Sequence, residues 1–287
     1  WHDFEYIKSL YCEFLPIIGD ILNKHHSKAC GSRSLKLVYG VWLQEYLTVM
    51  RERFVTIKHA IDSHPSHLFI LSAAEQTILD PLDFKQKITG DIYNLYLYSK
   101  IVKFIDPSKY KKSLFINLEK LDFERKQNFP ARLRRLIMRS ASTILQNIFD
   151  FATSKSSSVV DRSYFPWKHF VRLVLSSFPT ITPLVLLKDV KHKNTRPDLH
   201  IRRTLHHTFS NKIRAKTDFE KFLFENIFYD MPLSFIENFT DILEQSQYLK
   251  LSDKNYFSTN AVLGNHILQF SLAEQLSDHT DLVVAQH

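Results

Sequence analysis

Glycine is scarce in this chain: the 287 residues hold five, where average usage of about 7% would give roughly 20. They are Gly19, Gly31, Gly40, Gly90 and Gly264. A phosphate-binding loop built from glycine needs several of them within a few residues, because its backbone takes positive φ angles and approaches the ligand closely. The sequence therefore excludes such a loop within these residues, and it also excludes collagen-like and linker-like chains.

Cysteine and long apolar runs are also lacking. Cys12 and Cys30 are the two cysteines, too few to cross-link a domain of this size, so a reducing compartment is the simpler interpretation. A zinc site built from cysteines is excluded. The neighbouring histidines His25/His26 and His206/His207 would point about 100° apart on a helix, so we expect no metal and no cofactor. No stretch of about 18 apolar residues occurs, and none is predicted to span a membrane.

Material for a core is plentiful, since 44% of the residues are hydrophobic and 13% are aromatic. This excludes a disordered chain, and the length favours one large or two ordinary domains. The chain begins at Trp1 and ends in the apolar segment 281–287, which is typical of a buried strand. We therefore expect a piece of a longer protein, cut at both ends.

The first half is predicted to be mainly helical, because apolar residues recur there at three- and four-residue spacing. The predicted helices are 4–24, 34–62, 82–105 and 131–153, and one short strand is predicted at 67–71. Gly40 lies inside the second helix, where it costs up to about 1 kcal/mol relative to alanine. We expect it to mark a close helix contact beside a buried Trp42, and we expect Arg51 and Arg53 to form interhelical ion pairs.

Short strands alternate with helices in the second half. The predicted strands are 159–165, 184–187, 256–262 and 281–286, and the predicted helices are 167–178, 217–229, 232–248 and 265–278. This pattern predicts an α/β fold that is helix-rich, with a Rossmann-like parallel sheet joined by right-handed crossovers. We expect a mainly helical region over 1–155 and an α/β region over 156–287.

The net charge of 38 − 30 = +8 is concentrated in two blocks. Residues 100–140 hold 12 basic and 4 acidic groups, residues 188–216 hold 9 and 2, and residues 217–287 hold 3 and 11. Arg132, Arg135 and Arg139 of the first block share one face of the predicted helix 131–153. That face is either a solvated or interdomain surface, or a surface for nucleic acid or an anionic membrane.

The second basic block follows a predicted strand, where ligands bind in open α/β sheets. Its arginines Arg196, Arg202 and Arg203 could hold a phosphate or carboxylate, and a solvated loop is the alternative.

The sequence resembles a family of transferases found with bacterial O-antigen and other surface-polysaccharide biosynthesis. The resemblance rests on Leu22-Asn-Lys-His25 before the helix Ser34–Leu43 with its Gly-x-Trp-Leu pattern, and on an arginine about ten residues later. It also includes the acidic-aromatic segment Phe219–Phe239 and the strand–helix–strand from Asn260 to Gln-His287. The resemblance implies the first lobe of a two-lobed GT-B-like glycosyltransferase, with the nucleotide part of the donor held beyond residue 287. The chain alone would then be inactive.

Site residues follow from this resemblance and from strand ends. His287, at the end of a predicted buried strand, is the candidate general base, because an unperturbed imidazole pKa near 6.5 suits proton removal from an acceptor hydroxyl. A structural loop role is the alternative for His287. Tyr164 could stack on a sugar or pack in the core, and Asn260 is predicted to line the substrate site.

Two functions from different classes remain. The first is a transferase that moves a sugar or related unit from a nucleotide-activated donor to a glycan acceptor by direct displacement at carbon or phosphorus, in the cytoplasm or at the inner face of the membrane. The transferase hypothesis predicts no nucleic-acid partner and allows peripheral contact with an anionic membrane. The second is a non-enzymatic helical protein whose basic 100–140 face binds nucleic acid or an anionic membrane.

Overall fold

The structure is a computed structural model that describes residues 2–66, 69–71, 76–112, 158–161, 167–177, 180–184, 192–247, 255–258, 265–275 and 282–284. The chain divides into two compact units, each discontinuous in sequence. Unit 1 comprises Trp1–Phe123 and His192–Phe239, and unit 2 comprises Glu124–Lys191 and Thr240–His287. The predicted domain boundary at residue 155 falls inside unit 2, and residues 192–239 cluster with the first unit.

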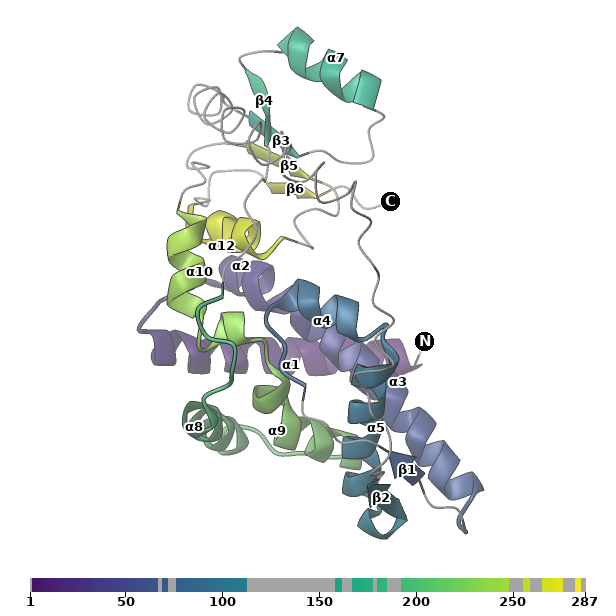
Figure 1. Cartoon of the computed structure of the whole chain (residues 1–287). Coiled ribbons are helices and arrows are strands. Elements are labelled where there is room, and N and C mark those ends of the chain that lie inside the picture. Colours follow the sequence, from purple (N-terminus) through teal and green to yellow (C-terminus); the bar gives the residue numbers. More distant parts are fainter. Residues whose placement is uncertain are drawn as a thin grey trace. The chain divides into compact units, whose positions relative to one another are not determined.

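Unit 1 is helical (Figure 1). Its elements are α1 (His2–His26), α2 (Ser32–Leu35), the π-helical turn η1 (Lys36–Gly40), α3 (Val41–Ser63), α4 (Pro81–Lys87), α5 (Asp91–Ile105), the 3-10 turn η2 (Pro107–Lys109), α8 (Leu199–Ser210), α9 (Asp218–Asp230) and the 3-10 turn η4 (Leu233–Phe235). Two short parallel strands, β1 (Phe69–Leu71) and β2 (Tyr110–Lys112), pair in register. The helix α10 (Phe239–Ser246) begins at the last residue of this unit.

Side chains that accept from backbone N–H groups fix where several of these helices begin. Asp80 precedes α4 and accepts from the amide of Asp83 at 2.9 Å, with Pro81 at the first helical position. Thr217 caps α9 in the same way, and Glu220 reaches back to the amide of Lys216 at 2.6 Å. These two bonds satisfy backbone amides at the start of α9 that no helical carbonyl can reach.

The core of unit 1 joins helices from distant parts of the sequence through aromatic rings. Phe14 of α1 contacts Phe209 of α8, with ring centroids 5.5 Å apart. Phe54 of α3 contacts Phe219 and Phe222 of α9 at 5.4 and 5.6 Å. In Figure 1 these green helices accordingly share a unit with the purple N-terminal ones. The Phe14–Phe209 pair is edge-to-face and the two Phe54 pairs are tilted, and aromatic pairs add about 0.5–1.5 kcal/mol each beyond burial of the rings.

Most predicted helices of unit 1 are confirmed. Helix 4–24 is α1, and Pro16 lies within it without ending it. Helix 34–62 is the continuous run α2, η1 and α3, in which Trp42 is buried. Gly40 marks the expected close contact, since a Cβ there would lie 2.5 Å from the hydroxyl oxygen of Tyr11. Helix 82–105 is two helices, because α5 starts anew after Gly90.

Two predictions in the second half need correction. The basic segment 188–203 was interpreted as a loop after a strand, yet α8 begins within it at Leu199, with Asp198 as its N-cap. The helix expected over 232–248 is interrupted: η4 and a turn precede α10, which starts at Phe239. The predicted helix 131–153, with Arg132, Arg135 and Arg139, lies outside the described residues.

Unit 2 contains a parallel sheet of four strands within its described residues. They are β3 (Ser158–Asp161), β4 (Ile181–Leu184), β5 (Asn255–Ser258) and β6 (Leu282–Val284), in the spatial order β4-β3-β5-β6. The helix α7 (Trp167–Ser177) lies between β3 and β4 in the chain, and α12 (His266–Gln275) lies between β5 and β6. All three pairings are parallel, as the alternation of strands and helices predicted.

The strand order places a switch point between β3 and β5. From β3 the chain first adds β4 on one side and later adds β5 on the other. In doubly wound sheets, ligands bind outside the carboxyl ends of the strands at such a point. The fold is thus helix-rich with a parallel α/β sheet.

Candidate functional site

Three of the predicted site residues lie outside the described part of the chain, and the three arginines lie inside it. His287, Tyr164 and Asn260 lie outside the described residues. Their nearest described neighbours are the last residues of the strands β6, β3 and β5, which are Val284, Asp161 and Ser258. The arginines Arg196, Arg202 and Arg203 are all described.

Arg202 is buried and fully engaged within the protein. Its Nε and Nη2 donate to the two carboxylate oxygens of Glu237 at 2.7 and 2.8 Å. Its Nη1 donates to the backbone carbonyls of Phe228, Tyr229 and Met231 at 2.8 to 2.9 Å. The side chain is 2% exposed and that of Glu237 is 5% exposed. The carbonyl bonds fasten α8 to the end of α9, and the bidentate pair fastens α8 to the loop before α10, so the guanidinium of Arg202 has a structural role.

Arg196 and Arg203 are exposed, and they form no ion pair with any residue in the described ranges. The charge of both arginines therefore faces solvent, as does that of Arg214 in the same basic block. That they bind an anion stays a prediction.

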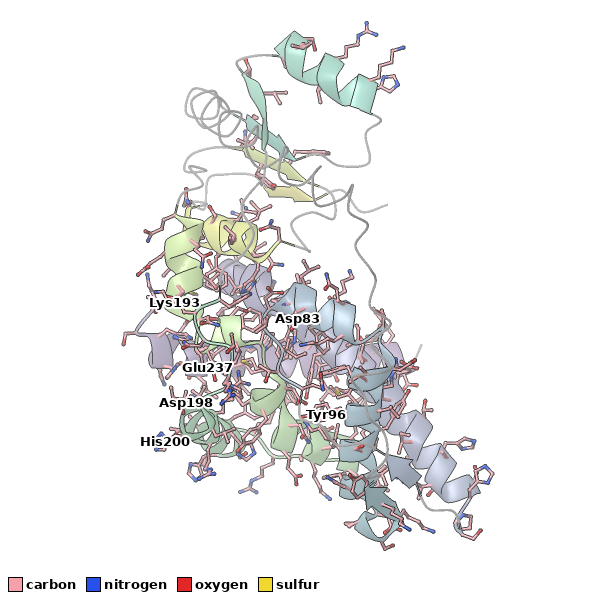
Figure 2. The ribbon with its side chains drawn as sticks, viewed as in Figure 1. Asp83, Tyr96, Lys193, Asp198, His200 and Glu237 are labelled. Carbon is pink, nitrogen blue, oxygen red and sulfur yellow. The ribbon has the colours of Figure 1, made fainter. Side chains whose placement is uncertain are left out.

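The loop between α9 and α10 joins four parts of unit 1 by hydrogen bonds. The amides of Leu233 and Ser234 donate to the carbonyls of Ile78 and Leu79 at 2.9 and 3.0 Å. Asn238 accepts from the amide of Asn194 at 2.8 Å and donates to its carbonyl at 2.9 Å. Figure 2 shows Glu237 of this loop on the same side of the unit as Lys193 and Asp198.

His26 completes this set of contacts from the end of α1. Its Nε2 lies 2.8 Å from the carbonyl oxygen of Phe235, and its ring stacks on Phe239 with centroids 3.8 Å apart. Burial lowers the pKa of His26 to about 4, although the Phe235 carbonyl acts in the opposite direction. The imidazole is therefore neutral at physiological pH, and it donates one hydrogen bond to the loop.

A histidine–carboxylate pair, unforeseen from the sequence, links two of the same segments. His192 Nε2 lies 2.9 Å from Asp80 Oδ2, and both side chains are mostly buried. Asp80 also caps α4, which fixes its orientation. The other ring nitrogen, Nδ1, is buried and has no hydrogen-bond partner among the described residues. A separation of 112 residues between the partners gives no sequence pattern by which the pair could have been found.

A second buried polar cluster lies between α3, α5 and α9. Asp230 accepts from the hydroxyl of Tyr46 at 3.0 Å and from Lys100 Nζ at 2.5 Å, and its side chain is 2% exposed. Burial raises the pKa of Tyr46, and the charge of Asp230 raises it further. The hydroxyl of Tyr93 is also buried, with no hydrogen-bond partner in the described part of the chain. Charge pairing and burial identify this cluster as a structural connection between helices.

The described residues also form an open apolar groove of about 660 Å³ between α1 and α3. Phe4 and Val55, which face it from the two helices, are 58% and 42% exposed. Arg51 lines the groove and donates to Asp3 at 2.9 Å, which confirms the expected interhelical ion pair. Arg53 instead pairs with its neighbour Glu52 and donates to Asn94 at 3.1 Å.

Two searches of the described ranges concern metals and membranes. No cluster of three or more histidine, cysteine or acidic side chains there is arranged to hold a metal ion. No helix within these ranges combines the length and the apolar character needed to cross a membrane.

The sequence from residue 2 to residue 287 matches the profile of the LIC12162 family transferase. This match covers nearly the whole chain, and the chain belongs to that family. No curated protein and no solved structure matches the sequence significantly. The protein is therefore a member of a transferase family.

Proposed function

We propose that this protein takes part in glycosyl transfer, moving a sugar or related unit from a nucleotide-activated donor to a surface glycan. Membership of a transferase family supports a group-transfer reaction. The parallel sheet with its switch point supports a donor or acceptor site of the doubly wound type, and we propose that it is the Rossmann-like sheet of a GT-B first lobe. We place the reaction in the cytoplasm or at the inner face of the membrane.

The positions of three predicted residues carry this proposal. In the sequence, Tyr164, Asn260 and His287 come two or three positions after the last residues of β3, β5 and β6. These three strands are neighbours and run parallel, so their carboxyl ends meet at one edge of the sheet. Residue types suited to stacking, hydrogen bonding and proton transfer thus follow adjacent strands at the edge where ligands bind.

The proposed chemistry is a direct displacement. His287 removes the proton from an acceptor hydroxyl as its oxygen attacks the anomeric carbon of the donor. The bond from that carbon to the donor phosphate oxygen breaks, and the nucleoside phosphate leaves with the electron pair. Tyr164 stacks on a sugar ring, and Asn260 hydrogen-bonds to hydroxyl groups of the substrate.

Release of nucleotide by the longer protein of which this chain is expected to be a part tests this proposal. With a panel of UDP-, GDP- and CMP-activated sugars and a purified glycan acceptor, we expect acceptor-dependent release from at least one donor. His287→Gln should lower kcat by about 10²–10⁴-fold with little change in KM, because general-base catalysis contributes that much. His169→Gln, at an exposed histidine of α7 in the same unit, is the matched control and should leave kcat unchanged. Full activity of the His287 variant, or no release from any donor, would contradict the proposal.

A further inference from the structure

The beginning of α8 carries two positive charges that are in no ion pair with any described residue. Arg196 lies just before the helix and Arg203 lies in its second turn, and both side chains are exposed. Neither makes an ion pair with any residue that the structure describes. Three other cations along this stretch are paired, Arg202 with Glu237, Lys212 with Asp20 and Lys216 with Glu13. Arg214, like Arg196 and Arg203, is exposed and in no ion pair with a described residue.

The periodicity of α8 places these charges on its solvent face. His200, Arg203 and His207 follow one another at three- and four-residue spacing and are all exposed. Arg202, Leu205 and Phe209 make up the buried side of the same helix. Figure 2 shows His200 on α8 at the outer margin of unit 1, consistent with its exposure.

A large apolar side chain protrudes among these charges. Leu199, the first residue of α8, is 57% exposed, and it is four residues before Arg203. Isolated exposed leucines are common on protein surfaces. Surfaces that bind at a lipid–water interface do, however, combine basic side chains with exposed apolar ones.

Acidic groups near this surface are already engaged. The carboxylate of Asp198 accepts from the amides of His200 and Ile201 at 2.9 and 3.1 Å, as the N-cap of α8. Glu237 accepts from Arg202 and from the amide of Asp198. Glu237 is thus neutralised by the buried Arg202, whereas Asp198 stays exposed and keeps its negative charge, so the exposed arginines Arg196 and Arg203 outnumber the one exposed carboxylate.

We propose that this surface, the α8 patch (Arg196, Leu199, His200 and Arg203), docks on the anionic headgroups of a lipid bilayer. The arginines supply attraction to phosphate and carboxylate headgroups, and Leu199 inserts at the interface. Leu199 favours a bilayer over nucleic acid, because a nucleic-acid backbone offers an aliphatic side chain nothing comparable to bury against. The inference concerns unit 1 and does not depend on the proposed glycosyl transfer.

Vesicle co-sedimentation with the 287-residue chain tests the α8 patch. The chain should bind vesicles of phosphatidylcholine with 30% phosphatidylserine, and much less to phosphatidylcholine alone, with binding that weakens as salt rises. Arg196→Gln with Arg203→Gln should weaken binding about fivefold per arginine. Lys58→Gln with Lys111→Gln removes the same charge at exposed positions on α3 and β2, and should change binding little. Equal losses in the two double variants, or no binding to anionic vesicles, would overturn the proposal.

Leu199→Ser separates a bilayer from other polyanions. It should weaken vesicle binding severalfold and leave the charge of the chain unchanged. Binding to a 30-base-pair DNA duplex serves as the comparison, measured with the same variants. If the chain binds DNA at least as tightly as vesicles, and Leu199→Ser weakens neither, the patch is a nucleic-acid surface and the lipid proposal is wrong. Tryptophan fluorescence should confirm that the variants remain folded.

Discussion

Two adjacent arginines on α8 occupy opposite environments, and this difference gives a prediction. Arg202→Ala should destabilise the protein by about 3–5 kcal/mol, because it leaves the carboxylate of Glu237 buried without its charge partner and leaves three carbonyls without a donor. Arg203→Ala, one residue along and exposed, should change the free energy of unfolding by about 0.5 kcal/mol or less. Urea unfolding followed by circular dichroism measures both, and equal losses would show that the Arg202–Glu237 pair contributes nothing particular.

His26 makes stability depend on pH. Its pKa is about 4 in the folded protein, because burial disfavours the charged ring, against 6.5 in the unfolded chain. As the pH falls, the unfolded chain therefore takes up the proton at a higher pH than the folded protein does. The contribution of the neutral His26 to the free energy of unfolding is fully present above pH 6.5. It is lost as the pH falls toward 4, by up to about 3 kcal/mol from this residue.

Carboxylates also titrate in acid and change the free energy of unfolding. The effect of His26 is therefore measured by comparing the natural protein with the variant His26→Asn. The free energy of unfolding should fall more steeply between pH 6.5 and 4.5 for the natural protein than for His26→Asn, because the variant has no titrating ring at this position. The variant should also be less stable at pH 7, where it lacks the ring that stacks on Phe239. Identical slopes for the two proteins would disprove the assignment.

At the scale of elements, side-chain caps fix the residue at which a helix begins. Thr217→Ala should destabilise the protein by about 1 kcal/mol, because Thr217 accepts from the amide of Glu220 at the start of α9. Thr204→Ala is the control: this exposed threonine lies inside α8, where alanine is the better helix former, so the variant should be equal or slightly more stable. Thermal unfolding distinguishes these opposite signs. A loss at Thr204 as large as that at Thr217 would show that capping is not the cause.

The elements also show what sequence patterns could predict. The apolar face of α1 repeats over 25 residues, and its prediction succeeded. In α8 the buried side includes Arg202, so the segment appeared polar and was taken for a loop. Asp198 as a possible N-cap, followed by Leu205 and Phe209 at helical spacing, was the pattern that could have revealed it.

Contacts between distant residues were beyond the reach of local patterns. The predicted helix over 232–248 is broken where Glu237 and Asn238 hydrogen-bond to residues 194–202. Tertiary bonds of this kind override the helical spacing of the apolar residues. The pairing of His192 with Asp80 likewise exists only in the folded chain. By contrast, parallel strands separated by helices can be recognised locally, and the parallel sheet of unit 2 was predicted.

At the scale of the whole molecule, unit 1 requires both of its sequence segments. The sequence predicted a mainly helical region over 1–155, and in the structure α8 and α9 belong to the same unit as α1, α3 and α5. Phe14 packs on Phe209, Phe54 packs on Phe219, and Lys100 pairs with Asp230. A chain of residues 1–155 alone would expose these aromatic rings and leave Lys100 without its carboxylate.

Residues 1–155 expressed alone should therefore fail to fold cooperatively. Losing contacts with α8 and α9 removes apolar burial from both α1 and α3, at about 25 cal/mol per Å² of surface, and a domain has only about 5–15 kcal/mol of net stability to lose. The expected result is a broad thermal transition and rapid amide exchange in α1 and α3, whereas the 287-residue chain protects both helices. Adding a peptide of residues 192–247 should restore part of that protection, because it supplies α8 and α9. Slow exchange in residues 1–155 without the peptide would show that the N-terminal region is an independent domain after all.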